Sequence, residues 1–461
     1  TQAFTVSVRE TDTAEVIPLN VEPHEQYWTI PGAVEIFDFD EDGIQDVLLA
    51  FTSYQNTMPR RELYPKNEIV ILSYQQNEIK NIAPQIFDIV PEIRVSSHVI
   101  FEDLDLDGDL DFVMSEAGMD EPPWTGGDII IAINEEVGYK NVAIPSEISG
   151  VRSYTIGAND LDSDGVIEIL LSDSNGVVNN KYNGLLLNYL NSNEIDVENN
   201  PIGFFWRNTD ANSFYTNDYN NDGIIDLLIG GHWNSPNYSI YFNGTNSDEV
   251  TLLPDGPYGW ISWDDAKVEG SHIGTDVNTI AQADFDNDGD IDLVSFDEKV
   301  ALNGLTDTVE VSFHYTQSSI NILENDGSGS FTSISPKNFS SELGLHLYMN
   351  HEIFDVNNDG LLDIFAHYTD KVVGPEIRYT MILVNEGNLQ FSKFDIDSYI
   401  GNYEGNGYVL PTGRFENAGA EVLVVKLSED DSNWPEASIN IVESYLSSIQ
   451  ISEDLSYIEF S

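Results

Sequence analysis

The chain lacks cysteine altogether and has few basic residues: 18 Lys and Arg stand against 80 Asp and Glu, which gives a formal net charge of -62. Without a thiol there is no disulfide, no thiolate zinc site and no cysteine nucleophile. So negative a surface repels phosphate backbones and anionic lipid head groups, which disfavours nucleic-acid and membrane-surface partners. No segment approaches the ~20 consecutive apolar residues of a membrane span, so we expect no membrane insertion.

The acidity nevertheless belongs to a folded protein, because 41% hydrophobic and 11% aromatic residues supply enough apolar surface for a core. With so few basic side chains, the carboxylates need another source of neutralising charge, and bound divalent cations would supply it. Low-affinity acidic sites fill only where calcium is abundant, which is outside the cell rather than in the cytosol. We therefore expect a secreted or cell-surface protein.

One nine-residue motif recurs along the 461 residues, and such internal repeats determine the architecture of a long chain. Its six copies, spaced 57 to 71 residues apart, begin at Asp38, Asp103, Asp160, Asp218, Asp284 and Asp355 and read DFDEDGIQD, DLDLDGDLD, DLDSDGVIE, DYNNDGIID, DFDNDGDID and DVNNDGLLD. A degenerate seventh copy, GRFENAGAE, begins at Gly413.

Each copy is followed by a β-rich run, such as DVLLAF, and usually preceded by another, such as AVEIF, so it predicts the turn of a β-hairpin. A third run, such as YSIYFN, and a weaker fourth complete each unit. Four short strands in each ~60-residue unit predict an all-β fold, a seven-bladed β-propeller with four-stranded blades. We favour it over a linear solenoid because ring closure leaves no exposed sheet edges. The propeller would span residues 27–461, and residues 1–26 form an N-terminal segment whose FTVSVRE would add a closing strand.

The repeated motif has the composition of a calcium-binding loop. Calcium takes six to eight oxygen ligands, and Asp or Asn at positions one, three and five turns three side chains toward one point. Gly at position six permits the sharp turn, position seven offers its carbonyl, and the acid at position nine closes the shell. The ligands predicted for about six structural Ca²⁺ sites are Asp38, Asp40, Asp42, Ile44 and Asp46; Asp103, Asp105, Asp107, Asp109 and Asp111; Asp160, Asp162, Asp164, Val166 and Glu168; Asp218, Asn220, Asp222, Ile224 and Asp226; Asp284, Asp286, Asp288, Asp290 and Asp292; and Asp355, Asn357, Asp359, Leu361 and Asp363.

Two other interpretations of these loops are weaker. A plain Asx-turn hairpin would explain one copy, because Asp, Asn and Gly dominate turns. Six copies that each gather like charges are costly without a cation, at about 1 to 4 kcal/mol for each close pair. An EF-hand or dockerin loop needs an acid at position twelve and flanking helices, whereas the flanks here are β-rich and position twelve holds Leu49, Met114, Leu171, Ile229, Ser295 and Ala366.

On these motifs, the sequence from residue 27 to 461 resembles the FG-GAP or VCBS repeats of integrin α-subunit propellers and of many bacterial exported proteins. The resemblance implies a calcium-binding propeller with its metal loops on one face and its partners on the other. The seventh copy departs from the pattern, since Gly413 and Phe415 replace two ligands and leave Asn417 and Glu421. We expect calcium in six loops and none in the seventh.

If the loops join first and second strands, the remaining connections leave at the opposite rim of the propeller. This topology places on that rim every Trp, a large share of the basic residues and several His: Trp28, Trp124, Trp206, Trp233, Trp260, Trp263 and Trp434; Arg60, Arg61, Arg94, Arg152, Arg207, Lys371 and Arg378; and His232, His314, His346, His351 and His367. Packing between blades explains any single Trp equally well. As a set, they suit a stacked sugar ring, an anionic polysaccharide or a protein ligand.

Three functions follow, of which we favour the first: a module that recognises a carbohydrate or an extracellular protein, with Trp124, Trp206, Trp233, Trp260, Trp434, Arg207 and His232 as candidate ligand-binding residues. The second is a polysaccharide lyase, in which His232 or Tyr238 acts as base and Arg207 neutralises a uronate carboxylate. The third is a structural or adhesin segment of a larger surface protein. The sequence shows no serine nucleophile elbow, phosphate-binding loop or His-rich zinc motif, and it leaves the oligomeric state open.

Overall fold

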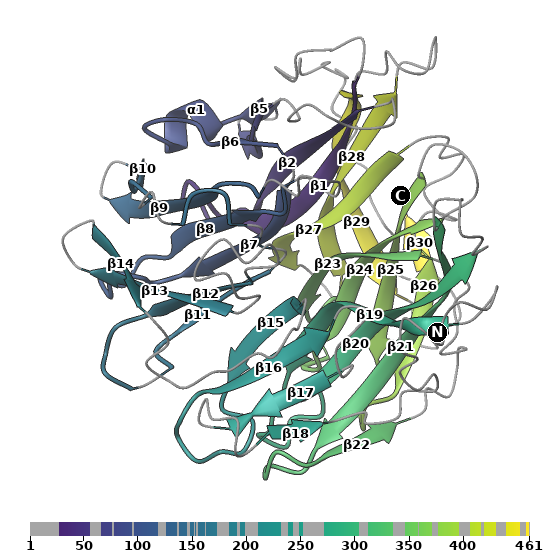
Figure 1. The fold of residues 1–461 in the computed structure, drawn as a ribbon. Coiled ribbons are helices and arrows are strands. Elements are labelled where there is room, and N and C mark those ends of the chain that lie inside the picture. The colour runs from purple at the N-terminus through teal and green to yellow at the C-terminus, as the bar shows by residue number, and fades with distance from the viewer. Residues whose placement is uncertain are drawn as a thin grey trace.

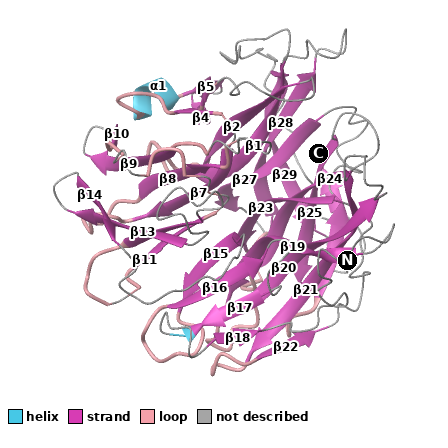
Figure 2. Cartoon of the chain, viewed as in Figure 1, coloured by secondary structure: helices cyan, strands magenta, loops and turns pink. Residues whose placement is uncertain are grey.

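The computed structural model describes residues 27–55, 66–75, 78–94, 96–118, 126–135, 138–144, 148–151, 153, 155–161, 163–172, 184–190, 194–198, 211–231, 238–242, 249–251, 272–303, 312–334, 346–357, 359–370, 377–395, 406–415, 419–429, 439–451 and 458–460. Strands dominate this part of the chain (Figure 2). None of its helices is long and apolar enough to cross a membrane. The N-terminal segment 1–26, with its predicted closing strand, lies outside these residues.

The described strands form seven four-stranded antiparallel sheets, each built from one stretch of the chain. The first three are β1 (Tyr27–Phe37), β2 (Asp46–Gln55), β4 (Val70–Gln75) and β5 (Glu78–Asn81); β7 (Ser96–Glu102), β8 (Asp111–Glu116), β9 (Ile129–Glu135) and β10 (Gly138–Asn141); and β11 (Ile156–Asn159), β12 (Glu168–Ser172), β13 (Gly184–Leu190) and β14 (Glu194–Glu198). Within each sheet the strands pair in chain order, as in a meander.

The other four sheets repeat this order. They are β15 (Ala211–Asn217), β16 (Asp226–Gly231), β17 (Tyr238–Tyr241) and β18 (Glu249–Thr251); β19 (His272–Ala283), β20 (Asp292–Asn303), β21 (Ser312–Asn325) and β22 (Phe331–Ile334); β23 (His346–Phe354), β24 (Asp363–Asp370), β25 (Ile377–Asn385) and β26 (Phe391–Asp395); and β27 (Asn406–Phe415), β28 (Gly419–Glu429), β29 (Ile439–Ile451) and β30 (Ile458–Phe460). All four strands of the seventh sheet thus come from the C-terminal part of the chain.

The sheets are arranged as a β-propeller, and the first strand of each repeat lies innermost (Figure 1). Strands β1, β7, β11, β15, β19 and β23 contact one another in sequence, β25 contacts β27, and β27 contacts β1. The first sheet also carries an insertion, which comprises β3 (Asn67–Glu68) paired with β6 (Glu92–Ile93) and the one-turn helix α1 (Ala83–Ile86).

The alternating direction of successive side chains along the second strand of each repeat explains how the sheets pack. On β8, Phe112 and Met114 belong to the core shared with the first sheet, whereas Val113 between them belongs to the core shared with the third. Successive side chains of a strand point to opposite faces, so one apolar run fills two cores. The same division recurs at Leu227 and Leu228 on β16. Runs that are apolar at every position, such as DFVMSE, therefore mark sheets buried on both faces.

Candidate metal-binding loops

Each of the six copies forms the connection between the first and second strands of its sheet, as predicted. In the first copy, the Asp38 carboxylate accepts backbone N–H bonds from Asp42 at 3.1 Å and Gly43 at 2.9 Å. The equivalent two bonds measure 2.7 to 3.1 Å across all six copies. Position one thus holds the loop closed from inside, with its carboxylate at the loop centre.

Two residues in each loop adopt left-handed backbone angles. The Gly at position six has φ between 85° and 105° in all six loops, and position four has φ between 56° and 62° in the five loops where it is described. Glycine adopts such angles freely, whereas they are sterically unfavourable for Leu106 at position four of the second loop. These two reversals curl the chain around one point, which is why positions one, three and five converge.

The convergence brings carboxylates close enough to share a cation. In four loops, three acids place one oxygen each within 4.8 Å of one another; these groups are Asp38, Asp40 and Asp42; Asp103, Asp105 and Asp107; Asp160, Asp164 and Glu168; and Asp284, Asp286 and Asp292. In the loops from Asp218 and Asp355, position three is Asn220 or Asn357, which donates to the position-five carboxylate. Among positions one, three, five and nine, those loops carry one negative charge fewer than the others.

Two buried oxygen atoms test whether the loops fit a cation. Asp105 Oδ1 and Asp286 Oδ1, at position three of the second and fifth loops, are buried without a hydrogen-bond partner. Burial raises the pKa of both carboxyl groups, and the neighbouring position-five carboxylates Asp107 and Asp288 raise it further. A buried, unpartnered carboxylate oxygen facing like charges is costly in a protein without a counterion. The donor set of clustered carboxylates and carbonyls suits a hard divalent cation such as calcium.

The acid at position nine has a second role that the sequence did not indicate. One of its oxygens accepts the backbone N–H of position two at 2.7 to 3.3 Å in all six loops. The other oxygen of Asp111, Asp292 and Asp363 accepts a backbone N–H from the third strand of the same sheet. Burial raises the pKa of Asp111 and Asp292 to about 7 and that of Asp363 to about 8. Position nine therefore ties the loop to its sheet, and a cation would use its remaining lone pairs.

The third-strand residue in this contact is asparagine, and its side chain joins neighbouring sheets. Asn325 donates to the carbonyl of Tyr219 at 2.8 Å, and Asn385 donates to that of Phe285 at 2.6 Å. Both carbonyls belong to position two of the preceding sheet's loop. Sequence reasoning missed these residues, although Asn ends the third run in INILEN, IRYTMILVN and IIIAIN and was a usable signal. We call this contact the asparagine latch.

Neighbouring loops also contact each other directly. Asn221 in the fourth loop donates to the Asp290 carboxylate in the fifth at 2.6 Å, and Asn287 in the fifth donates to the Gly360 carbonyl in the sixth at 3.1 Å. Both Asn residues occupy position four, where the left-handed angle turns their side chains outward. The loops from Asp218 to Asp363 thus form one hydrogen-bonded series on a single face.

The seventh copy is shorter than the others in the structure. Strand β27 continues to Phe415 and β28 starts at Gly419, so Gly413 and Phe415 are strand residues. Phe415 pairs with Ala420, whereas the other copies pair the residue before position one with position nine. Without Asp at positions one and three, the seventh copy lacks the carboxylates that accept the backbone N–H bonds of the other loops, and its two strands extend further toward the turn.

Several predicted residues lie outside the described part of the chain. They are Asp162 among the metal ligands and Trp124, Trp206, Trp233, Trp260, Trp434, Arg207 and His232 among the rim residues. Trp28 pairs with Tyr54 at the end of the β1–β2 hairpin away from the loop, as the topology required. His351, predicted near the rim, is instead a partly buried residue of β23 near its loop end and stacks on Phe296, with a centroid distance of 6.4 Å. Burial lowers its pKa to about 4.

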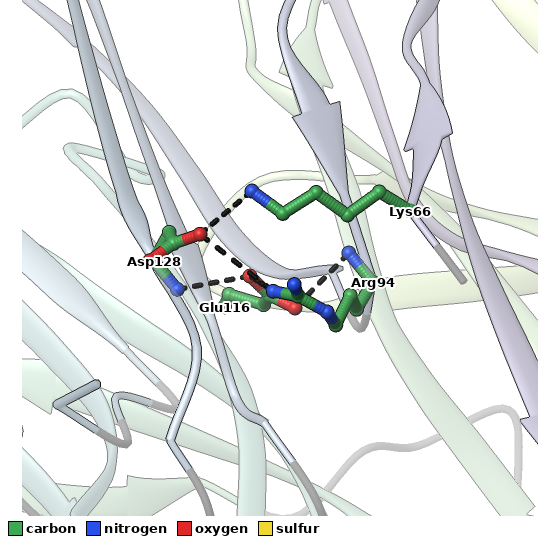
Figure 3. A network of polar contacts seen from close by, with 4 residues as sticks. All are labelled: Lys66, Arg94, Glu116 and Asp128. Carbon is green, nitrogen blue, oxygen red and sulfur yellow. Dashed lines mark hydrogen bonds and ion pairs between the residues drawn. The ribbon is translucent and has the colours of Figure 1, made fainter. Parts of the chain in front are cut away.

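Two basic residues at the opposite end form a compact ionic network between the first and second sheets (Figure 3). Lys66 Nζ lies 2.7 Å from Asp128, and the Arg94 guanidinium lies 3.6 Å from Asp128 and 3.8 Å from Glu116. The buried Glu116 carboxylate accepts backbone N–H bonds from Arg94 and Asp128. Because two cations face two carboxylates, this network braces the sheet junction and leaves little net positive charge for an anionic ligand.

Comparisons with solved structures find only distant likenesses. Similar solved structures include the exotype rhamnogalacturonan lyase YesX (11% identity, 94% of this chain and 72% of that one, TM-score 0.34) and the β-fructofuranosidase BmSUC1 of Bombyx mori (9% identity, 91% and 83%, TM-score 0.32). A third is the PilY1 C-terminal domain of Pseudomonas aeruginosa (11% identity, 85% and 82%, TM-score 0.29). Likenesses at these TM-scores carry no argument about activity.

A search of curated proteins gave no match. A family model described as an FG-GAP-like repeat matches residues 302–366. This segment runs from the end of β20 through the loop that begins at Asp355 and into β24, so it contains the sixth candidate loop with β23 and the start of β24. The match to an FG-GAP-like repeat therefore covers one of the six complete loops, the one with Asn357 at position three.

Proposed function

We propose that this chain is a secreted, calcium-loaded, seven-bladed β-propeller that recognises a carbohydrate or an extracellular protein on the face opposite its metal loops. The seven sheets are the blades, the six complete loops hold about six structural calcium ions, and the seventh loop holds none. The observation that carries the proposal is the geometry of the loops: four of the six gather three acids at one point, and position three of two of these leaves a buried carboxylate oxygen without a hydrogen-bond partner.

The separation of metal and ligand faces rests on strand direction. Every complete loop leaves its sheet at the first-to-second strand connection, so the other ends of these strands meet at the opposite face. Trp28 stands at such an end. The Lys66 and Arg94 network lies at that end as well, where it stiffens the junction between the first two sheets. A rigid rim of this kind suits recognition, because a preorganised surface loses less entropy on binding.

Calcium removal tests the structural part of the proposal. Each site filled at a hundredfold above its dissociation constant contributes about 2.7 kcal/mol, so several sites together approach the net stability of a domain. We expect the melting temperature of a metal-free sample to fall sharply and to recover on adding calcium, with magnesium as the control ion. A melting curve that is identical with and without calcium in a verified metal-free sample would contradict structural calcium.

A glycan array probed with and without calcium tests the recognition part. We expect glycan binding to depend on calcium only because calcium keeps the protein folded. Glycan binding should therefore be lost at the same calcium concentration at which the protein unfolds. An assay for unsaturated products from uronate polymers runs in parallel. Turnover in that assay would replace recognition by lyase chemistry, and failure of both assays with folded, calcium-loaded protein would leave a structural or adhesin role.

A further inference from the structure

Position four of the metal-binding loops divides them into two groups. The fourth, fifth and sixth loops have asparagine there, and the first three do not: the residues are Asn221, Asn287 and Asn358 against Glu41, Leu106 and Ser163. Among the described side chains at this position, only Asn221 and Asn287 donate a hydrogen bond to another loop. Direct bonds from position four therefore join the fourth loop to the fifth and the fifth to the sixth.

The contact between the fourth and fifth loops ends on a predicted calcium ligand. Asn221 Nδ2 lies 2.6 Å from Asp290 Oδ1, and Asp290 is position seven of the fifth loop, which offers its carbonyl. The Asp290 N–H donates to the Asp288 carboxylate at 3.1 Å. Asp290 is thus held by its side chain from the fourth loop and by its backbone from within the fifth. Asn221 itself stands between two ligands of the fourth loop, Asn220 and Asp222.

The turn between β21 and β22 packs against the same two loops. A Cβ atom added at Gly327 would lie 2.5 Å from Asp290 Oδ2, and one added at Gly329 would lie 3.4 Å from the Cβ of Asn220. Both glycines have positive φ, 74° and 77°, which suits a backbone that approaches its neighbours this closely. Because the turn touches residues of both loops, a shift of either loop must displace the turn or the other loop.

The contact between the fifth and sixth loops ends on backbone that lies between two ligands. Asn287 Nδ2 lies 3.1 Å from the Gly360 carbonyl. The N–H of the same peptide group belongs to Leu361 and donates to Asp359, the position-five ligand, at 2.9 Å. Leu361 is position seven, whose carbonyl is a predicted ligand. The fifth loop therefore fixes the peptide group that connects positions six and seven of the sixth loop.

We propose that calcium binding by the fourth, fifth and sixth loops is coupled, with the fifth loop at the centre and Asn221 and Asn287 as positioning residues. This inference rests on the calcium loading proposed above. An ion in the fifth loop holds Asp290 and Asn287 where the neighbouring loops need them, so those loops lose less conformational entropy when they close. Each hydrogen bond raises the calcium affinity of the neighbouring loop about two- to tenfold. The gain goes to the loops with Asn220 and Asn357, which have one charged ligand fewer.

The coupling differs from simple electrostatics in sign and in location. Two filled sites repel each other, which lowers the affinity for the second ion at every pair of neighbouring loops. The hydrogen bonds act in the opposite sense and only at the two contacts described. Since coupling is reciprocal in free energy, the midpoint that moves is that of the loop that fills later. The fifth loop has the full set of carboxylates and fills first, so changes in it are read out in the fourth and sixth loops.

The experiment changes the fifth loop and observes its neighbours. Wild type, Asp290→Ala and Asn287→Gly, isotopically labelled at the glycine nitrogen, are titrated with buffered calcium while NMR follows the amides of Gly223, Gly289 and Gly360. Each of these N–H groups donates to the position-one carboxylate of its own loop, so its resonance reports closure of that loop. Asp290→Ala keeps the backbone carbonyl. Glycine replaces Asn287 because it adopts the φ of 62° freely.

The two variants should give a crossed pattern. Asp290→Ala should move the Gly223 midpoint to about two- to tenfold higher calcium and leave Gly360 unchanged, and Asn287→Gly should do the reverse. Asp109→Ala, the same position in the second loop, is the matched control and should move neither midpoint. Unmoved midpoints in both variants would overturn the coupling, and so would shifts of both neighbours in both variants, which mean that the fifth loop has lost its ion. If no glycine resonance responds to calcium, the calcium loading itself is wrong.

Discussion

The asparagine latch predicts a large loss of stability when Asn385 is replaced by alanine. The buried amide donates to the carbonyls of Phe285 at 2.6 Å and Leu362 at 3.2 Å, and its oxygen accepts the Gly387 N–H at 3.0 Å. A net hydrogen bond contributes about 0.5–1.5 kcal/mol, and a stranded buried polar group costs about 1–3 kcal/mol. With water replacing part of the loss, we expect Asn385→Ala to cost about 2–4 kcal/mol.

Denaturant unfolding at fixed, saturating calcium measures this cost, with calcium titrated separately into each variant. Asn325→Ala is the matched variant, because Asn325 makes the same contacts to Tyr219 at 2.8 Å and Ile291 at 3.2 Å one sheet earlier. Gln85→Ala, on the exposed surface of α1, is the neutral control. Since Phe285 is position two of the fifth loop, Asn385→Ala should also weaken calcium binding at that loop and leave the first loop unchanged.

The reasoning fails if both alanine variants unfold within about 0.5 kcal/mol of the wild type, the range of ordinary surface substitutions. It fails in a different way if stability falls but calcium affinity at the fifth loop does not. In that case the latch holds the sheets together without positioning the loop. A large cost at Asn385 with none at Asn325 would mean that the contact is local to one junction rather than a property of the repeat.

Three further outcomes are expected. Asp105→Ala should remove one bound calcium and lower the melting temperature, as measured by metal analysis and calorimetry, because it deletes the oxygen that lies buried without a partner. The loops with Asn220 and Asn357 should release calcium first in a chelator titration followed by anomalous scattering, because each lacks one charged ligand. Any calcium at the seventh copy would contradict the prediction that its shortened hairpin binds none. Trp124→Ala and Trp233→Ala should each weaken ligand binding several-fold, by about 0.5–1.5 kcal/mol beyond area burial, with an unchanged melting curve; unaltered affinity in both would move the ligand off the rim.

The loops were the most predictable part of the molecule because their structure is local. Asp at position one, Gly at position six and the acid at position nine act within nine residues. The Gly43 N–H donates to Asp38 and the Phe39 N–H donates to Asp46 inside that span. The flanking strands followed from continuous apolar runs, and the number of sheets followed from the number of repeats. Local chemistry repeated many times leaves few alternatives open.

The insertion in the first sheet was not predicted. The segment that forms α1 and β6 has neither a helical nor a strand period, and α1 is a single turn that starts at Ala83, has Pro84 in its first turn and ends at Ile86. The insertion is held by its surroundings, since Phe87 packs into the core between the first two sheets and Asp88 N–H bonds to Tyr139 carbonyl. Tertiary contacts fixed what local propensity left open.

The latch could not be recognised from sequence for a related reason. Asn325 and Asn385 act on carbonyls 106 and 100 residues earlier in the chain, and nothing near them in the sequence identifies that partner. Sequence patterns show which residues repeat, whereas the contacts between residues of different repeats depend on the folded arrangement of the sheets.

The loops and the latch together imply that calcium acts on the ring rather than on single hairpins. A cation held by positions one, three and five fixes the loop, and position nine passes that constraint to the third strand through Asp292 or Asp363. The asparagine at that strand end then bonds to the loop of the preceding sheet. Each filled loop therefore stabilises a junction between sheets as well as its own turn. In a repeat protein, stability is the sum of unit and interface contributions, so ions that strengthen interfaces also raise cooperativity. Chelation should for this reason broaden the unfolding transition as well as lower it, which would not happen if each ion stabilised only its own hairpin.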